Sequence, residues 1–293
     1  MMAKALSKRM APAASPEIRQ GLIGRESGMD WMRCAVRSGL AAWALVALPV
    51  AAAEQSPPDI SGFWSLDMAP NVSDPALIAK LPPDTVVLDD TGVTEFPSGE
   101  FGGLKLKPEA RAAAARWKPQ DEMTLSRVCA APSIVYAIQG PFPFEIHQTP
   151  TLIVFKYEYF DQVRLIFMDG RPHPPADAPH SKVGHSTGHW EGDELVIDTT
   201  HLAPATITNN GLDHSANVHM VERYKLSADG NMLKATQWFE DPETLDNNGA
   251  RYIQWEKKAG SYVFPYDCDP SFAIQYQTIG NPADESGEGT PAP

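Results

Sequence analysis

Short apolar runs separated by turn residues dominate the chain from residue 133 onward. The runs are rich in Val, Ile, Phe, Tyr and Trp, the side chains that suit a pleated, half-buried strand. Turn-forming sequences such as Asp169-Gly170 and Asp229-Gly230 lie between them. This pattern predicts strands at Ile134–Gln139, Phe144–Gln148, Leu152–Tyr159, Val163–Met168, His185–Trp190, Leu195–Thr199, Val218–Leu226, Met232–Phe239, Arg251–Lys257 and Tyr262–Tyr266.

Two elements precede these runs. Residues 59–66 predict a first strand that contains Gly62-Phe63-Trp64, and residues 108–117 (PEARAAAARW) predict a short surface helix because Pro at the start is followed by good helix formers. Residues 69–100 are rich in Pro, Asp and Gly and predict an irregular excursion. We therefore expect an all-β protein, an antiparallel meander that closes into a barrel or sandwich, with one short helix. The Gly-x-Trp opening followed by a meander is similar to that of lipocalin-like barrels.

The N-terminal region has the pattern of a secretory signal peptide. Arg33 and Arg37 precede the apolar run 39–50, and three alanines follow before Glu54. We expect cleavage after Ala53, with residues 1–28 as an over-long extension before a start at Met29; an uncleaved membrane anchor is the alternative. The expected organisation is a signal peptide at 1–53, one β-rich domain at 54–280, and a disordered polar tail at 281–293. Such a protein is periplasmic or secreted.

Charge and cysteine content narrow the classes of partner. The formal net charge is −13, which argues against broad contact with nucleic acid. No run of eighteen apolar residues exists, so we expect no stable membrane anchor after cleavage. Export would leave Cys129 and Cys268, which either form one disulfide in an oxidising compartment or remain as two buried thiols. The expected partner is a small-molecule substrate or ligand.

Common cofactor and nucleophile motifs are absent from the sequence. It contains no phosphate-binding Gly-rich loop, no G-x-S-x-G, no H-E-x-x-H and no C-x-x-C. This pattern argues against nucleotide binding and α/β-hydrolase chemistry. A divalent transition metal held by histidines is the one cofactor that the composition leaves open.

All eight histidines lie between residues 147 and 219. They are metal ligands, general acids and bases, or hydrogen-bonded turn residues. His185 and His214 fall at predicted strand ends next to turn-forming residues, so we expect them to be functional, whereas His173 and His180 lie in a Pro-rich loop and favour the turn interpretation. The candidate metal set is His185, His214 and His219.

Strand alternation separates the charged residues near His219. His219, Val221 and Arg223 share one face of their predicted strand, and Glu222 shares the other with apolar neighbours. A carboxylate among apolar side chains needs a partner, for which Arg164 and Arg171 are candidates. Glu222 is therefore either an acid–base group beside a cavity or half of a buried ion pair.

A series of motifs between residues 141 and 241 carries a family resemblance. The sequences PFPFEIHQTP, DGRPHP and GHSTGHWEGD follow in this order, and later H-S, H and E-R positions follow them. The chain resembles a large group of uncharacterised secreted bacterial proteins with P-F-x-I-x-Q-T-P, D-G-R-x-H-P and G-H-S-x-G-x-W-E-G-D motifs. The resemblance implies a related fold and no particular activity. The matching residues are His173, His185, Glu191, Asp193, His214, His219, Glu222 and Arg223, and His189 falls at a variable position.

Two functions fit these observations. The first is an exported small-molecule enzyme, a lyase, isomerase or hydrolase, that uses a His/Glu/Arg cluster for acid–base catalysis with or without a metal. The alternative is a non-catalytic periplasmic binding protein for a small organic ligand. The candidate catalytic residues are His185, His214, Glu222, Arg223 and Arg171.

Overall fold

The computed structural model describes residues 56–67, 73–90 and 94–279. The predicted signal peptide and the polar tail lie outside these described residues. Within them, no helix is long and apolar enough to cross a membrane. Cys129 and Cys268 form a disulfide, the first of the two alternatives that the sequence leaves open.

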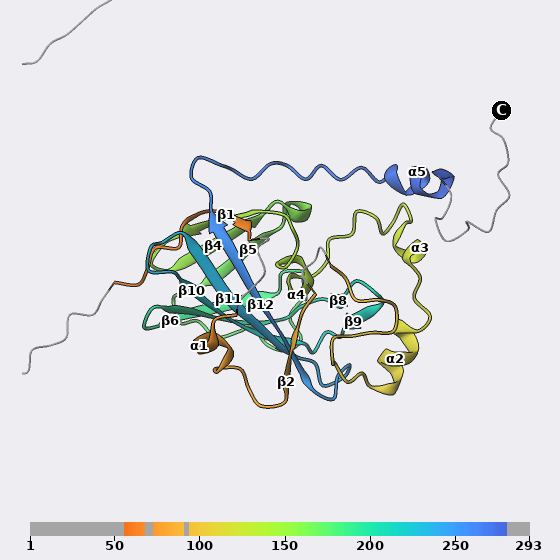
Figure 1. Cartoon of the computed structure of the whole chain (residues 1–293), viewed down its shortest axis with the longest axis horizontal. Coiled ribbons are helices and arrows are strands. Elements are labelled where there is room, and N and C mark those ends of the chain that lie inside the picture. Colours follow the sequence, from red (N-terminus) through yellow and green to blue (C-terminus); the bar gives the residue numbers. More distant parts are fainter. Residues whose placement is uncertain (1–55, 68–72, 91–93, 280–293) are drawn as a thin grey trace, which may run out of the picture. The chain divides into compact units, whose positions relative to one another are not determined.

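Nine strands close into a β-barrel (Figure 1). Closure occurs where the first strand pairs antiparallel with both the third and the twelfth. The barrel strands, in spatial order, are β1 (Gly62–Leu66), β3 (Phe144–Gln148), β4 (Leu152–Tyr157), β5 (Val163–Phe167), β6 (His185–Glu191), β7 (Glu194–Thr200), β10 (His219–Leu226), β11 (Met232–Glu240) and β12 (Asn248–Lys257).

The strands are not a simple antiparallel meander. β5 and β6 are parallel, joined through Ile166 and Ser186, because the Pro-rich loop between them carries the chain back to the same end of the barrel. β2 (Thr85–Leu88) adds a parallel strand to β12. β8 (Ala205–Thr208) and β9 (Leu212–His214) form a separate two-stranded sheet. Neither β2 nor this sheet was predicted.

The described residues contain more helix than expected. The predicted helix is present as α2 (Pro108–Ala114). Four other short helices, α1 (Pro75–Ile78), α3 (Pro119–Glu122), α4 (Ile134–Ala137) and α5 (Phe272–Ile279), and a 3-10 turn, η1 (Tyr159–Asp161), were not predicted.

Two predicted strands are wrong. Ile134–Gln139 was expected as a strand and contains α4 instead. This apolar segment is buried on all sides, and the side chains of Gln237 and Arg251 donate to the carbonyls of Ile134 and Val135. These side chains give the buried carbonyls of the segment the hydrogen bonds that a neighbouring strand would otherwise supply.

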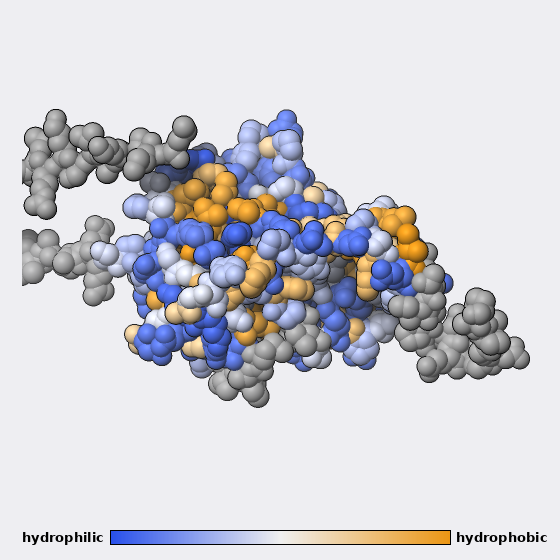
Figure 2. Space-filling view, turned by 90° about the horizontal axis from the view of Figure 1, so that it is seen from above, coloured by the Kyte–Doolittle hydropathy of each residue, from blue (hydrophilic) through white to orange (hydrophobic). Residues whose placement is uncertain are grey.

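The segment Tyr262–Tyr266, also predicted as a strand, has no strand structure. Its backbone amides donate to side chains instead, Phe264 to Glu158 and Tyr266 to Asp161. Figure 2 shows a mostly hydrophilic face with a few apolar patches. The exposed large apolar side chains include Tyr262, Phe264, Phe272 and Ile274 of this C-terminal segment and α5.

The barrel interior is filled with large side chains. Trp64, Phe144, Phe155, Tyr224 and Trp255 are each at most 1% exposed. Their rings meet in stacked and edge-to-face contacts with centroids 5.2 to 6.0 Å apart. Aromatic pairs of this kind pack densely, so this part of the barrel interior is a packed core.

Candidate functional site

Polar side chains gather on the outer face of β6, β7 and β10. Alternation along each strand sends Ser186, Thr199 and Met220 into the core, where they are at most 1% exposed. The residues before each of these point the opposite way. The outward set consists of His185 on β6, Asp198 on β7 and His219 on β10, joined by His173 from the loop between β5 and β6.

Hydrogen bonds connect these four side chains into one network, which we call the His–Asp cluster: His173, His185, Asp198 and His219. The Nε2 atoms of His173 and His219 lie 2.8 and 2.9 Å from the two carboxylate oxygens of Asp198. The Nδ1 atoms of His173 and His185 lie 2.9 Å apart. Nδ1 of His219 lies 3.4 Å from Glu240 Oε1. The side chains of His173, His219 and Asp198 are 24%, 33% and 39% exposed, so solutes can reach the cluster.

The bonding pattern assigns the protons. A carboxylate only accepts hydrogen bonds, so His173 and His219 donate from Nε2 to Asp198. When His173 is neutral, its Nδ1 accepts from Nδ1–H of His185. The Nε2 lone pair of His185 then remains for a proton acceptor role, and no hydrogen bond among the described residues reaches that atom.

The two ends of the cluster titrate in opposite directions. The hydrogen bond to Asp198 raises the pKa of His219, against the effect of burial. Burial lowers the pKa of His185, and the neighbouring His173 and Arg171 lower it further. Burial alone would raise the pKa of Asp198, but the bonds from the two histidines outweigh it and the pKa is lowered. Thus Asp198 stays ionised, His219 favours its protonated form and His185 favours its neutral form.

A small groove adjoins the His219 end of the cluster. Trp238 of β11 stands edge-on to the His219 ring, with centroids 5.9 Å apart. The same indole lines a cavity of about 150 Å³ together with Val221, Leu81 and Pro82. At the other end of the cluster, Phe167 stacks on His185. Both ends therefore have an aromatic wall beside an imidazole.

The two predicted arginines flank this region, and each is paired with a carboxylate. Arg223 lines the groove, but its guanidinium donates to Glu191 at 2.7 Å and lies 3.7 Å from Glu194. Arg171 covers the ring of Phe167 at 3.9 Å and donates to Asp169. Each cation thus has a carboxylate partner, which weakens its attraction for an anionic substrate.

Glu222 is part of a buried ion pair and not of the cluster. Its side chain is 0% exposed inside the barrel, where it accepts from Arg164 at 2.5 Å and from the hydroxyl of Tyr224 at 2.9 Å. Arg164 also donates to Ser186 and Thr199. The side chain lies on the opposite face of β10 from the cluster, so the structure favours the ion-pair alternative over a catalytic role.

His214 lies apart from the other predicted metal ligands. It is 2% exposed on β9, with Nε2 2.7 Å from Ser133 Oγ and Nδ1 2.8 Å from the carbonyl of Ser215. Burial lowers its pKa. The set of His185, His214 and His219 is therefore not assembled, and the described ranges contain no group of three His, Cys, Asp or Glu side chains arranged to hold a metal ion.

Two members of the cluster were missed as site residues. His173 was assigned to a turn, although it stands in the D-G-R-P-H-P motif. Asp198 was not considered, although an acidic residue in the apolar run of β7 (ELVIDTT) is a signal of an outward-facing functional group. His180, by contrast, is exposed as expected for a loop residue. No protein-family model and no curated protein matches the chain, so the functional argument rests on this geometry.

Proposed function

We propose that the protein is an exported small-molecule enzyme that uses the His–Asp cluster for acid–base catalysis. One observation carries the proposal: a single carboxylate, Asp198, holds His173 and His219 in a partly exposed hydrogen-bonded chain that ends at His185. The buried His214 bonds to Ser133 and to the carbonyl of Ser215, whereas this arrangement links three partly exposed imidazoles and has a groove at its His219 end. A lyase, isomerase or hydrolase reaction is the class that such a set serves.

His185 is the general base of this proposal. Its lowered pKa keeps the imidazole neutral at neutral pH, and its Nε2 is the free proton acceptor. Phe167 covers one face of the ring, which fixes the direction of the lone pair. A proton taken up at Nε2 makes the imidazolium, which Asp198 stabilises through His173.

His219 is the general acid. Its raised pKa favours the protonated ring. Asp198 holds the Nε2 proton, so the proton given to the substrate is the one on Nδ1, whose contact with Glu240 is longer, at 3.4 Å. Trp238 beside the ring places a flat substrate within reach. Pairs of titratable groups whose pKa values are pushed apart are typical of acid–base assignments in enzymes. The small, mainly apolar groove with compensated charges favours a neutral, flat substrate over an anionic one.

Export is the second part of the proposal. The Cys129–Cys268 disulfide supports it, because disulfides persist in oxidising compartments and are rare in the cytosol. The expected location is the periplasm or the medium.

The test is solvent-proton exchange in a panel of ketones, lactones and unsaturated carbonyl compounds. Incubation in D₂O followed by ¹H NMR detects deuterium incorporation, isomerisation and bond cleavage in one measurement. We expect at least one compound to react with the wild-type protein and to lose that reaction in Asp198→Asn and His219→Gln. His189→Gln is the matched control, since His189 lies on the same strand β6 but pairs with exposed Glu191.

Two outcomes would contradict the proposal. One is a reaction that survives Asp198→Asn unchanged. The other is saturable binding of panel compounds without turnover, with binding lost in the same variants, which favours the non-catalytic binding protein.

A further inference from the structure

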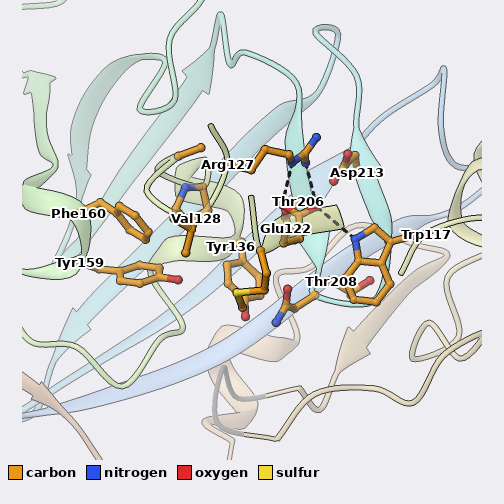
Figure 3. A pocket seen from close by; sticks show the side chains of 15 residues that line it. Trp117, Glu122, Arg127, Val128, Tyr136, Tyr159, Phe160, Thr206, Thr208 and Asp213 are labelled. Atoms are coloured by element: carbon orange, nitrogen blue, oxygen red, sulfur yellow. Dashed lines mark hydrogen bonds and ion pairs between the residues drawn. The ribbon is translucent and has the colours of Figure 1, made fainter. Parts of the chain in front are cut away.

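A second cleft lies away from the His–Asp cluster and shares no residue with it. It has a volume of about 140 Å³ and is formed by the segment 117–136, by η1 and by the sheet of β8 and β9 (Figure 3). The Cys129–Cys268 disulfide ties one rim of the cleft, next to Val128 and Ala130, to the C-terminal segment. This volume accommodates one small ring rather than an extended chain.

Aromatic rings form the two ends of the cleft. Figure 3 shows Tyr159 and Phe160 at one end, Tyr136 between, and Trp117 at the other. Phe160 has a φ of 55°, in the left-handed region that bulky residues rarely adopt. Backbone outliers of this kind cluster at ligand sites, because the surrounding structure must hold them in place. Here the outlier presents a ring to the cleft.

Two of the charged side chains that line the cleft, Arg127 and Glu122, form an ion pair. Arg127 donates to both carboxylate oxygens of Glu122, at 2.8 and 3.0 Å, and Trp117 donates to the same carboxylate at 3.2 Å. Asp213, on β9, has its pKa raised by burial and by Glu122, while Arg127 and Lys182 act in the opposite direction. Arg127 and Glu122 neutralise each other, and burial disfavours the charged form of the Asp213 carboxyl. The lining therefore offers neither a cation nor an anion a strongly charged partner.

Uncharged polar side chains line the cleft on the β8–β9 side. Thr206 lies next to the Asp213 carboxylate, and the Tyr159 hydroxyl lies toward the other end of the cleft. Asn209 also lines the cleft. Hydroxyl and amide groups both donate and accept hydrogen bonds, and a carboxylate accepts them. This set matches hydroxyl groups, which have the same dual capacity.

We propose that this cleft binds an uncharged ring compound that carries several hydroxyl groups, a monosaccharide or a cyclic polyol. The apolar C–H face of the ring packs on the aromatic side chains, in the way that amphipathic rings combine apolar contact with polar edges. The hydroxyl groups bond to Asp213 and Asn209. This site is independent of the proposed acid–base function, because none of its residues belongs to the His–Asp cluster.

The test is isothermal titration calorimetry with four uncharged probes, D-glucose, D-galactose, N-acetyl-D-glucosamine and myo-inositol, and two charged ones, benzylamine and inorganic phosphate. We expect saturable binding of at least one uncharged probe that exceeds binding of both charged probes. Asp213→Ala should weaken this binding roughly tenfold, equivalent to about 1.4 kcal/mol. Asn209→Ala, at an exposed residue, is a second variant in case Asp213→Ala perturbs folding.

The controls separate this site from the rest of the molecule. Asp193→Ala removes an exposed carboxylate in the β6–β7 turn and should leave binding unchanged. His219→Gln should also leave it unchanged, which keeps this test distinct from that of the enzyme. Absence of binding by all uncharged probes into the tens-of-millimolar range would overturn the proposal. Tighter binding of benzylamine or phosphate would overturn it too, as would unchanged affinity in the folded Asp213→Ala and Asn209→Ala variants.

Discussion

Neutralising Glu222 should destabilise the barrel more than any surface charge change. Glu222→Gln keeps the shape of the side chain but leaves the Arg164 guanidinium, 1% exposed, without a counter-charge. Arg164 would retain its bonds to Ser186 and Thr199, and among the described residues its Nη1 has no hydrogen-bond partner even before the change. Removing one partner of a buried ion pair costs about 3–5 kcal/mol because the other charge stays buried.

The size of this effect can be measured by urea unfolding. A loss of about 3–5 kcal/mol is a large share of the 5–15 kcal/mol that a typical domain has, and corresponds to a fall of roughly 6–20 °C in Tm for a domain of this size. The urea midpoint should fall with little change in slope. Glu191→Gln is the control, since its ion pair with Arg223 is on the surface and should contribute at most about 1 kcal/mol.

A double variant distinguishes the buried charge from simple packing damage. Arg164→Met with Glu222→Leu removes both charges and should recover most of the stability lost in Glu222→Gln. The reasoning fails if Glu222→Gln costs no more than Glu191→Gln, or if the double variant is less stable than the single one.

Further expectations concern the histidines and the cross-link. Asp198→Asn should lower the NMR titration midpoint of His219, because the carboxylate is what raises that pKa. The loss of stability in this variant should be largest below about pH 6.5, the pKa of histidine in the unfolded chain, and should shrink as the pH rises through the pKa of His219 in the folded protein. A loss of stability that does not change with pH would contradict this reasoning. His214→Ala should cost about 1–3 kcal/mol in thermal melts by leaving a buried Ser hydroxyl without its partner, and equal stability of His214→Ala and the exposed-residue control His180→Ala would contradict this. Cys268→Ser, which opens a cross-link of 139 residues in sequence separation, should cost about 2–5 kcal/mol by the same assay, and an unchanged Tm would show that the disulfide adds no stability.

Alternation along single strands allowed several contacts to be predicted from the sequence. The placement of Glu222 on the face opposite to His219 and Arg223 followed from period two, and Arg164 was a named partner for it. The all-β class and the barrel followed from the same periodicity and from the turn residues between the runs.

Contacts between strands could not be read in the same way. Asp198 meets His173 and His219 because β6, β7 and β10 are neighbours, and the β8–β9 insertion before β10 hides that adjacency in the sequence. Likewise the apolar segment at Ile134 has no alternation, so periodicity could not distinguish a buried helix from a buried strand. Its helical form depends on barrel side chains far along the chain, such as Gln237.

Closure of the barrel through β1 and β12 also determines when folding can finish. Trp64, near the start of the described residues, pairs with Lys257 near their end. Until β12 leaves the ribosome, β1 and β11 are open strand edges that can pair with other chains. Long-range pairing of this kind slows folding, since the entropy of a long loop is lost before the contacts form. The newly made chain therefore has a long aggregation-prone interval, and chaperone binding during synthesis should matter more for its yield than for that of a helical protein of equal length.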